Sequence, residues 1–110
     1  MIKNYLNEGI DACISGAISK YPKINKYKVR IYWDNELIKE KKRGEIIITG
    51  NKVNIRISPF QEYLDILDTL RHELAHLAQH SKGLRLKHNK KFKKMTIKLW
   101  KAWVEKMNRR

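Results

Sequence analysis

The residues best suited to chemistry lie in the segment His72-Glu73-Leu74-Ala75-His76. Two histidines four positions apart share one face of a helix, about 6 Å from each other, where both imidazoles can bind one Zn²⁺ ion. A glutamate next to the first histidine can hold a water molecule and take its proton as the water attacks a peptide carbonyl. The spacing therefore predicts a metal-dependent hydrolytic site. The alternative is a pair of histidines exposed on a helix surface.

A catalytic zinc site needs a third protein ligand and an open fourth position. His80 continues the four-residue spacing, but a helix rises about 1.5 Å per residue, so His80 would lie about 12 Å from His72 along the axis. His88 lies beyond the predicted end of the helix, where the chain can turn back over the site. We therefore predict that His88 is the third ligand, beside His72 and His76. Glu73 is the predicted general base, and His80 either supports a ligand, faces substrate or is simply exposed.

The motif must be carried by a helix that buries its opposite face. Apolar residues at three- and four-residue spacing predict this helix, with the stripe Leu67, Leu70, Leu74 and Leu77. The preceding segment Ser58-Pro59-Phe60-Gln61 supplies a cap hydroxyl, a proline for the first helical position and a glutamine. Gly83 is the predicted end of the helix.

The last quarter of the chain predicts a basic amphipathic helix. Its apolar stripe consists of Phe92, Met95, Leu99, Trp100, Trp103 and Met107, and its other face carries Lys91, Lys94, Lys98 and Lys101. The two tryptophans could serve as stacking platforms for nucleic-acid bases. Their helical spacing favours a position in the core instead.

The first twenty residues predict another amphipathic helix. Its pattern spans residues 2–21, ends at Pro22 and places Cys13 on the buried side, as a packing residue. As the only cysteine, Cys13 excludes an internal disulfide and a cysteine-rich zinc ribbon. Glu8 and Asp11 argue against a signal peptide, and no apolar run reaches the roughly 18 residues of a membrane span. We therefore expect a cytoplasmic protein.

Three strands are predicted between these helices. Alternating apolar residues over 29–33 predict the first strand, and the charged residues 36–43 predict a loop. Residues 46–48 and 53–57 flank the turn signal Gly50-Asn51, which predicts a hairpin. The element order predicts one α+β domain with a small three-stranded, largely antiparallel sheet.

Charge is concentrated at one end of the chain. The 110 residues hold 25 Lys and Arg against 11 Asp and Glu, a net charge of +14, and 42% of them are hydrophobic, enough for one modest core. Residues 82–110 hold 12 of the basic side chains and one acidic side chain, Glu105. This segment is either a solvated helix face or a surface for an anionic partner such as nucleic acid.

Two groups of residues resemble the SprT-like (Spartan-type) zinc metalloproteases, which are HExxH zincins. The segment Leu70-Arg71-His72-Glu73-Leu74-Ala75-His76 is followed, after eleven residues, by His88-Asn89-Lys90-Lys91-Phe92. This pattern is similar to that family's HExxH and, about a dozen residues later, His-Gly-x-x-Phe/Trp. The resemblance covers roughly residues 43–103. It implies that residues 1–110 are a minimal zincin-like metalloprotease domain, with His72, His76 and His88 as zinc ligands and Glu73 as general base.

Two features depart from the family pattern. Asn89 stands where the family usually has glycine, and we expect the turn to be kept because asparagine tolerates left-handed backbone angles. The C-terminal zinc ribbon of many members is missing, so nucleic acid would have to contact the domain's own lysines. The family is associated with DNA and with proteolysis of proteins crosslinked to it. The resemblance thus implies protein substrates, with DNA as a partner of the Lys-rich C-terminal helix.

Zinc peptidases of this type commonly hold an extended peptide against a sheet edge by main-chain hydrogen bonds. The strand over residues 53–58 leads directly into the predicted metal helix. It is either that edge or an ordinary core strand with a polar outer face. The oxyanion-stabilising residue is not identified by the sequence.

Three hypotheses follow. The leading one is a zinc-dependent endopeptidase that hydrolyses peptide bonds with a metal-activated water, acting on DNA-bound or DNA-crosslinked proteins. The second is a basic nucleic-acid-binding module whose zinc site is structural or vestigial. The third is a small interaction protein without metal. Three imidazoles suit zinc, and also cobalt or nickel.

Overall fold

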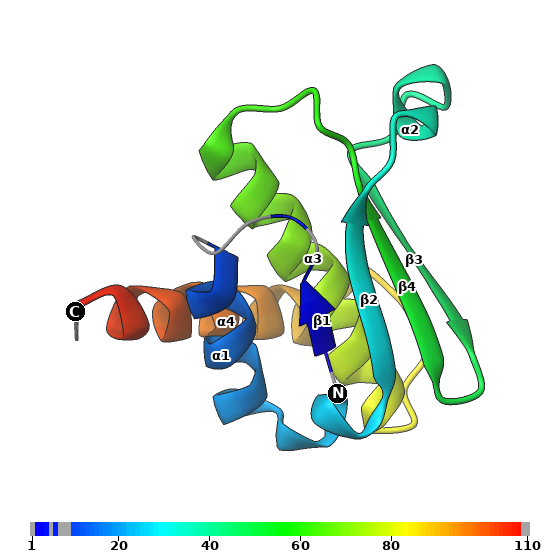
Figure 1. The fold of residues 1–110 in the computed structure, drawn as a ribbon. Helices are drawn as coiled ribbons and strands as arrows, with labels where there is room; N and C mark the ends of the chain where they lie inside the picture. Colours follow the sequence, from blue (N-terminus) through cyan, green and yellow to red (C-terminus); the bar gives the residue numbers. More distant parts are fainter. Residues whose placement is uncertain (1, 5, 7–9, 109–110) are drawn as a thin grey trace.

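The computed structural model describes residues 2–4, 6 and 10–108 (Figure 1). Its elements, in chain order, are β1 Ile2–Asn4, α1 Asp11–Lys20, the 3₁₀ helix η2 Pro22–Lys26, β2 Lys28–Trp33, α2 Glu36–Lys39, β3 Gly44–Thr49, β4 Lys52–Ile57, α3 Tyr63–Ser81 and α4 Lys90–Asn108. The predicted α+β class is confirmed. Within the described part of the chain, no helix has both the length and the apolar character needed to cross a membrane.

The sheet has four strands in the order β1-β2-β4-β3. The predicted hairpin is confirmed, since β3 and β4 pair antiparallel around Gly50-Asn51. The predicted three-stranded, largely antiparallel sheet is wrong, because β1 pairs parallel to β2 and β2 pairs parallel to β4. β4 lies inside the sheet because its inward row, Val53, Ile55 and Ile57, is the most completely buried of the hairpin. Residues 53–57 are therefore a core strand, and β3 is the edge.

The predicted helix over residues 2–21 is wrong at its start. The described helix begins at Asp11, and Ile2–Asn4 form β1, which pairs with Val29–Ile31 of β2. Residues 5 and 7–9 of the predicted helix lie outside the described residues. Periodicity cannot identify a strand of three residues, because its pairing partner is distant in sequence. Cys13 is buried in the core as predicted, and burial raises the pKa of its thiol to about 12.

Two further predictions are wrong in detail. The predicted loop over residues 36–43 contains the short helix α2, which is anchored by the fully buried side chain of Leu37. α3 begins at Tyr63, without a side-chain cap, rather than after Ser58. Gln61 does not cap the helix, because its amide nitrogen donates to the Ser58 and Arg43 carbonyls and so closes the preceding loop.

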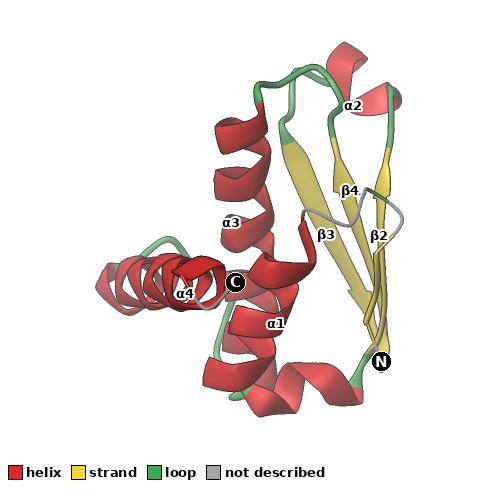
Figure 2. Ribbon diagram, turned by 60° about the vertical axis from the view of Figure 1, so that its left-hand side comes forward, coloured by secondary structure: helices red, strands yellow, loops and turns green. Residues whose placement is uncertain are grey.

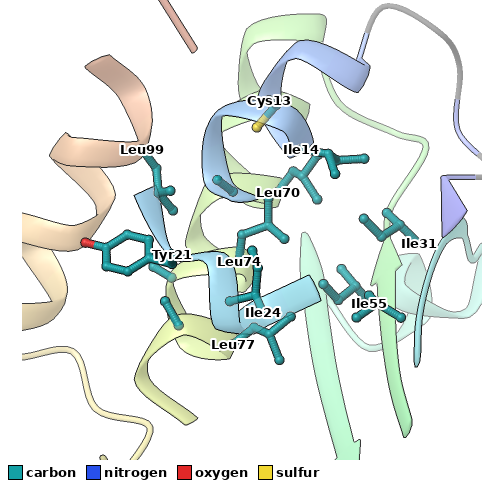
Figure 3. Close-up of a cluster of buried hydrophobic side chains, with 14 of the residues drawn as sticks. Cys13, Ile14, Tyr21, Ile24, Ile31, Ile55, Leu70, Leu74, Leu77 and Leu99 are labelled. Carbon is teal, nitrogen blue, oxygen red and sulfur yellow. The ribbon is translucent and has the colours of Figure 1, made fainter. Parts of the chain in front are cut away.

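Helices α1, α3 and α4 gather on one face of the sheet (Figure 2). The predicted stripe of α3 is confirmed: its four leucines are fully buried, Leu67, Leu70, Leu74 and Leu77. α3 ends at Ser81, and Gly83 follows with a positive φ of 74°, as the predicted stop requires. Figure 3 shows how side chains of α1, η2, the sheet, α3 and α4 meet in one core.

α4 packs against α1 and α3. Its buried side chains are Phe92, Met95, Leu99 and Ala102. The predicted burial of the whole stripe is wrong for Trp100, which is 49% exposed, and for Met107, which is 37% exposed. The contact face of α4 is narrower than its apolar stripe: among the described elements, α4 packs mainly against α1 and α3, and these do not cover Trp100 or Met107.

The close approach of α1 and α4 depends on Gly16. A Cβ atom on this residue would lie 3.1 Å from both the carbonyl carbon and the Cβ of Ala102. Helix packing at this distance leaves no room for a larger side chain. Gly16 therefore helps to set the position of α4.

We expect Gly16→Val to lower the free energy of unfolding by about 1–3 kcal/mol, because the added side chain overpacks the α1–α4 contact. Urea denaturation measures the change. Ser15→Val is the matched control, since Ser15 is exposed on the same helix and the new side chain meets no neighbouring helix. Equal stabilities of the two variants would show that the contact is not tight.

Candidate metal centre

The three predicted ligands meet at one point. His72 and His76 lie on successive turns of α3, and His88 lies in the loop before α4. The Nε2 atom of His88 is 2.9 Å from Nε2 of His76 and 3.0 Å from Nε2 of His72. One ligand nitrogen of each side chain lies within 4.8 Å of the others, close enough for all three to bind one metal ion.

The aromatic ring of Phe92 contacts the imidazoles of all three histidines. Its ring centroid lies 4.8 Å from that of His72, 4.5 Å from that of His76, on which it stacks, and 5.0 Å from that of His88. Phe92 is in the first turn of α4, where its backbone N–H donates to Oδ1 of Asn89. The expected left-handed angle at Asn89 is not found. Asn89 caps α4 instead, and so directs Phe92 toward the histidines.

Gln79 connects two of the ligands. Its side chain is 1% exposed, and its Nε2 donates to the carbonyl oxygen of Lys87, 2.8 Å away. Its Oε1 therefore accepts from Nδ1 of His76, also at 2.8 Å. This bond fixes the His76 tautomer, which leaves Nε2 free to bind a metal, while the second bond holds the backbone next to His88.

Gln79 is absent from the site predicted from sequence. The spacing could have indicated its role, because Gln79 follows His76 by three positions, and residues three apart on a helix are neighbours on its surface. The bond to the Lys87 carbonyl joins α3 to a loop eight residues away, and sequence spacing does not reveal it.

The site favours uncharged imidazoles. Burial, together with the neighbouring His76 and His88, lowers the pKa of His72 to about 4. Burial also lowers the pKa of His76, against the opposing effect of its hydrogen bond to Gln79. The neutral imidazole is the form that binds metal, so protons compete little with a metal ion for the nitrogens of His72 and His76 near neutral pH.

Glu73 lies on the same helix and is 6% exposed. It lines, with His72, a hollow of about 350 Å³ between α3 and the start of β3; we call this the β3 hollow, lined by Lys42, Arg43, Gly44, Asp68, Thr69, His72 and Glu73. Burial, followed by the negative charge of Glu45, raises the pKa of Glu73 to about 7. A carboxyl group in this range can both accept and donate a proton near neutral pH.

Glu45, the acidic neighbour of Glu73, is held in a charged network that the sequence did not indicate. Arg56 of β4 pairs with Asp34 at 3.0 Å, with Glu40 at 3.3 Å and with Glu45. Hydrogen bonds from Arg56, the largest effect, and from Lys42 hold the pKa of Glu45 below its usual value. The network thus joins β3, β4 and the end of α2 beside the site.

The fourth histidine, His80, is not part of the cluster formed by His72, His76 and His88. Nδ1 of His80 is 2.8 Å from the hydroxyl oxygen of Tyr27, and the two rings are in edge contact. The described structure therefore leaves His80 out of the group that could share an ion.

We expect the folded protein to bind one divalent ion per chain and His88→Ala to weaken its binding by about a hundredfold or more, because one of three nitrogen ligands is lost. Competition with a chromophoric chelator measures the affinity, with zinc as the probe. His80→Ala is the matched control and should bind zinc as the wild type does. Loss of binding in that control, with His88→Ala unaffected, would mean that the third ligand is wrong.

We expect Gln79→Leu to weaken zinc binding by about 10–100-fold, because the variant loses the hydrogen bond to His76 and the one to the Lys87 carbonyl next to His88. Gln61→Leu is the matched control: Gln61 also bonds a loop carbonyl and a side chain of α3, Thr69, but no histidine. The control should change stability without changing zinc affinity. Similar zinc affinities in the two variants would contradict this role of Gln79.

Comparison with known proteins gives no further guide to the site. No family model matches this chain, and no match was found among curated proteins or solved structures.

Proposed function

We propose that this protein is a zinc-dependent endopeptidase. The observation that carries the proposal is the convergence of three histidine nitrogens within 4.8 Å, beside a buried glutamate on the same helix. A purely structural ion does not need that carboxylate. In a hydrolase the glutamate is required, as the group that moves the proton of the attacking water.

The donor set fits zinc. Three imidazoles, two of which have pKa values lowered by burial (His72 and His76), form a borderline-soft nitrogen site, which suits zinc, and also cobalt or nickel. A zinc ion bound there would supply a Lewis acid that polarises the carbonyl and makes a water molecule more acidic.

Glu73 is the proposed general base. Glu73 lines the β3 hollow together with His72, and we propose that a water molecule and a peptide carbonyl meet there. The carboxylate accepts the proton of the water and then donates it to the amine released from the cleaved bond.

The free edge of β3 is the proposed peptide-binding strand. β3 is the last strand of the sheet order, and it contacts α3, the helix that carries the site. An extended peptide added to this edge would lie beside the β3 hollow, held by main-chain hydrogen bonds. This assignment replaces β4, which is paired on both sides.

The basic C-terminal segment supports a second, compatible function. A hollow of about 500 Å³ is lined by four cations, with Gln79, Leu84 and Asn89: Arg85, Lys87, Lys90 and Lys91. Side chains of this type bind phosphates, and such binding weakens with salt. We propose DNA as a partner that would bring DNA-bound proteins to the site. If the metal had only a structural role, this binding would be the main function.

We expect Glu73→Gln to reduce cleavage of fluorescently labelled, unfolded casein by about a hundredfold or more, with zinc still bound, because the proton acceptor is lost. Glu105→Gln is the matched control, since it makes the same chemical change on the exposed face of α4. Elemental analysis of each variant measures bound zinc.

Full cleavage by the zinc-loaded Glu73→Gln variant would contradict the proposed base. A zinc-loaded wild type that cleaves nothing, yet binds duplex DNA in a salt-dependent way, would favour the binding module.

A further inference from the structure

The second, larger hollow beside the histidines is on the α4 side. It has a volume of about 890 Å³, and we call it the α4 hollow; its lining includes His72, His88, Phe92, Thr96, Ile97 and Trp100. Two of the three predicted ligands thus form part of its wall. A group bound here would lie directly beside the metal centre.

Two large apolar side chains in the lining of the hollow, Ile97 and Trp100, are not buried in the core. Ile97 is 50% exposed and Trp100 is 49% exposed, although the same helix buries Phe92, Met95, Leu99 and Ala102. Large apolar side chains that line a concave surface next to polar, metal-binding groups are typical of a ligand site.

The α4 hollow and the β3 hollow share part of their walls. His72 and Asp68 line both, so the two hollows lie on either side of these α3 side chains. A peptide held along β3 would cross the histidines, and one side chain next to the cleaved bond would then point toward Ile97 and Trp100. An occupant of this hollow is therefore a side chain of the substrate itself.

The rim of the α4 hollow is positively charged. Lys90 and Lys93 line it, and neither forms an ion pair with a described residue. The acidic residue of the lining, Asp68, is paired with Arg71. A carboxylate close to the apolar side chain would therefore be attracted to the two lysines.

We propose that the α4 hollow selects substrates in which a residue flanking the cleaved bond has a large apolar side chain, with an acidic residue nearby. This inference rests on the proposed peptidase function. The specificity determinants are Ile97 and Trp100 for the apolar side chain, and Lys90 and Lys93 for the carboxylate.

Peptide hydroxamates test the hollow without requiring catalysis, because a hydroxamate binds the metal and places its neighbouring side chain next to it. We would measure binding to the zinc-loaded protein of compounds that carry alanine or leucine, each with and without an adjacent aspartate. We expect leucine to bind about tenfold more tightly than alanine. Aspartate should add a smaller gain that decreases with salt.

The variants assign the effect to the hollow. Trp100→Ala and Ile97→Ala should abolish most of the preference for leucine, and Thr96→Phe should do so by filling the space. Ile38→Ala is the matched control, because Ile38 is 42% exposed on α2 and does not line the hollow. Thermal denaturation of each variant establishes that it is folded.

The outcomes separate the two proposals. Equal binding of the leucine and alanine compounds, or a leucine preference that all three hollow variants keep, would overturn the α4 hollow as a specificity site. A leucine preference that these variants lose supports it, even if the wild type cleaves no peptide and the peptidase proposal fails. No hydroxamate binding at all would overturn both.

Discussion

α3 packs into the hydrophobic core with one face and carries two candidate metal ligands on the other. The positions of the surrounding elements follow from this double role of the helix. One face carries four fully buried leucines that fix the helix against the sheet and α1. The other face carries His72 and His76, whose positions follow from how the buried leucines place the helix. Burial of polar groups in this setting is costly unless each has a partner. Gln79 has a partner for each end of its buried amide: its Oε1 accepts from His76, and its Nε2 donates to the carbonyl oxygen of Lys87.

The third ligand is positioned by a separate part of the structure. His88 lies between α3 and α4, so its location depends on how α4 is docked. Gly16 allows α4 to lie close against α1, and Asn89 starts α4 at the residue that brings Phe92 under the three imidazoles. Residues near both ends of the chain are thereby coupled to one small group of nitrogen atoms. The geometry of the site is a property of the whole helical layer.

Sequence reasoning identified the parts of this structure that depend on local periodicity. The leucine stripe of α3, the hairpin and the proximity of His72 to His76 were predicted correctly, because spacing along a helix or a turn fixes which residues are neighbours. The place of His88 beside them was also predicted correctly, from the exclusion of His80 and the resemblance to SprT-like proteases rather than from spacing. Sequence reasoning also predicted that Phe92 belongs to the buried stripe of α4, although not that its ring contacts all three histidines.

The features that sequence reasoning missed depend on contacts between distant segments. β1 is only three residues long, too short for a periodic pattern. The position of β4 between β2 and β3 depends on strand pairing between segments that are distant in sequence. The spacing of Trp100 fits the buried stripe of α4 and predicts a core position, yet its side chain is 49% exposed and lines the α4 hollow. The bond from Gln79 to the Lys87 carbonyl likewise joins a helix to a loop.

The division of the ligands between α3 and the loop before α4 has a thermodynamic consequence. His88 lies just before α4, so an ion bound by His72, His76 and His88 would favour the docked position of α4, and binding and docking would be linked equilibria. A free ion concentration a hundred times the dissociation constant would stabilise the docked state by about 2.7 kcal/mol. The supply of metal in the surroundings would thus set how often the C-terminal helix detaches, and with it how often the core beneath that helix is exposed to water.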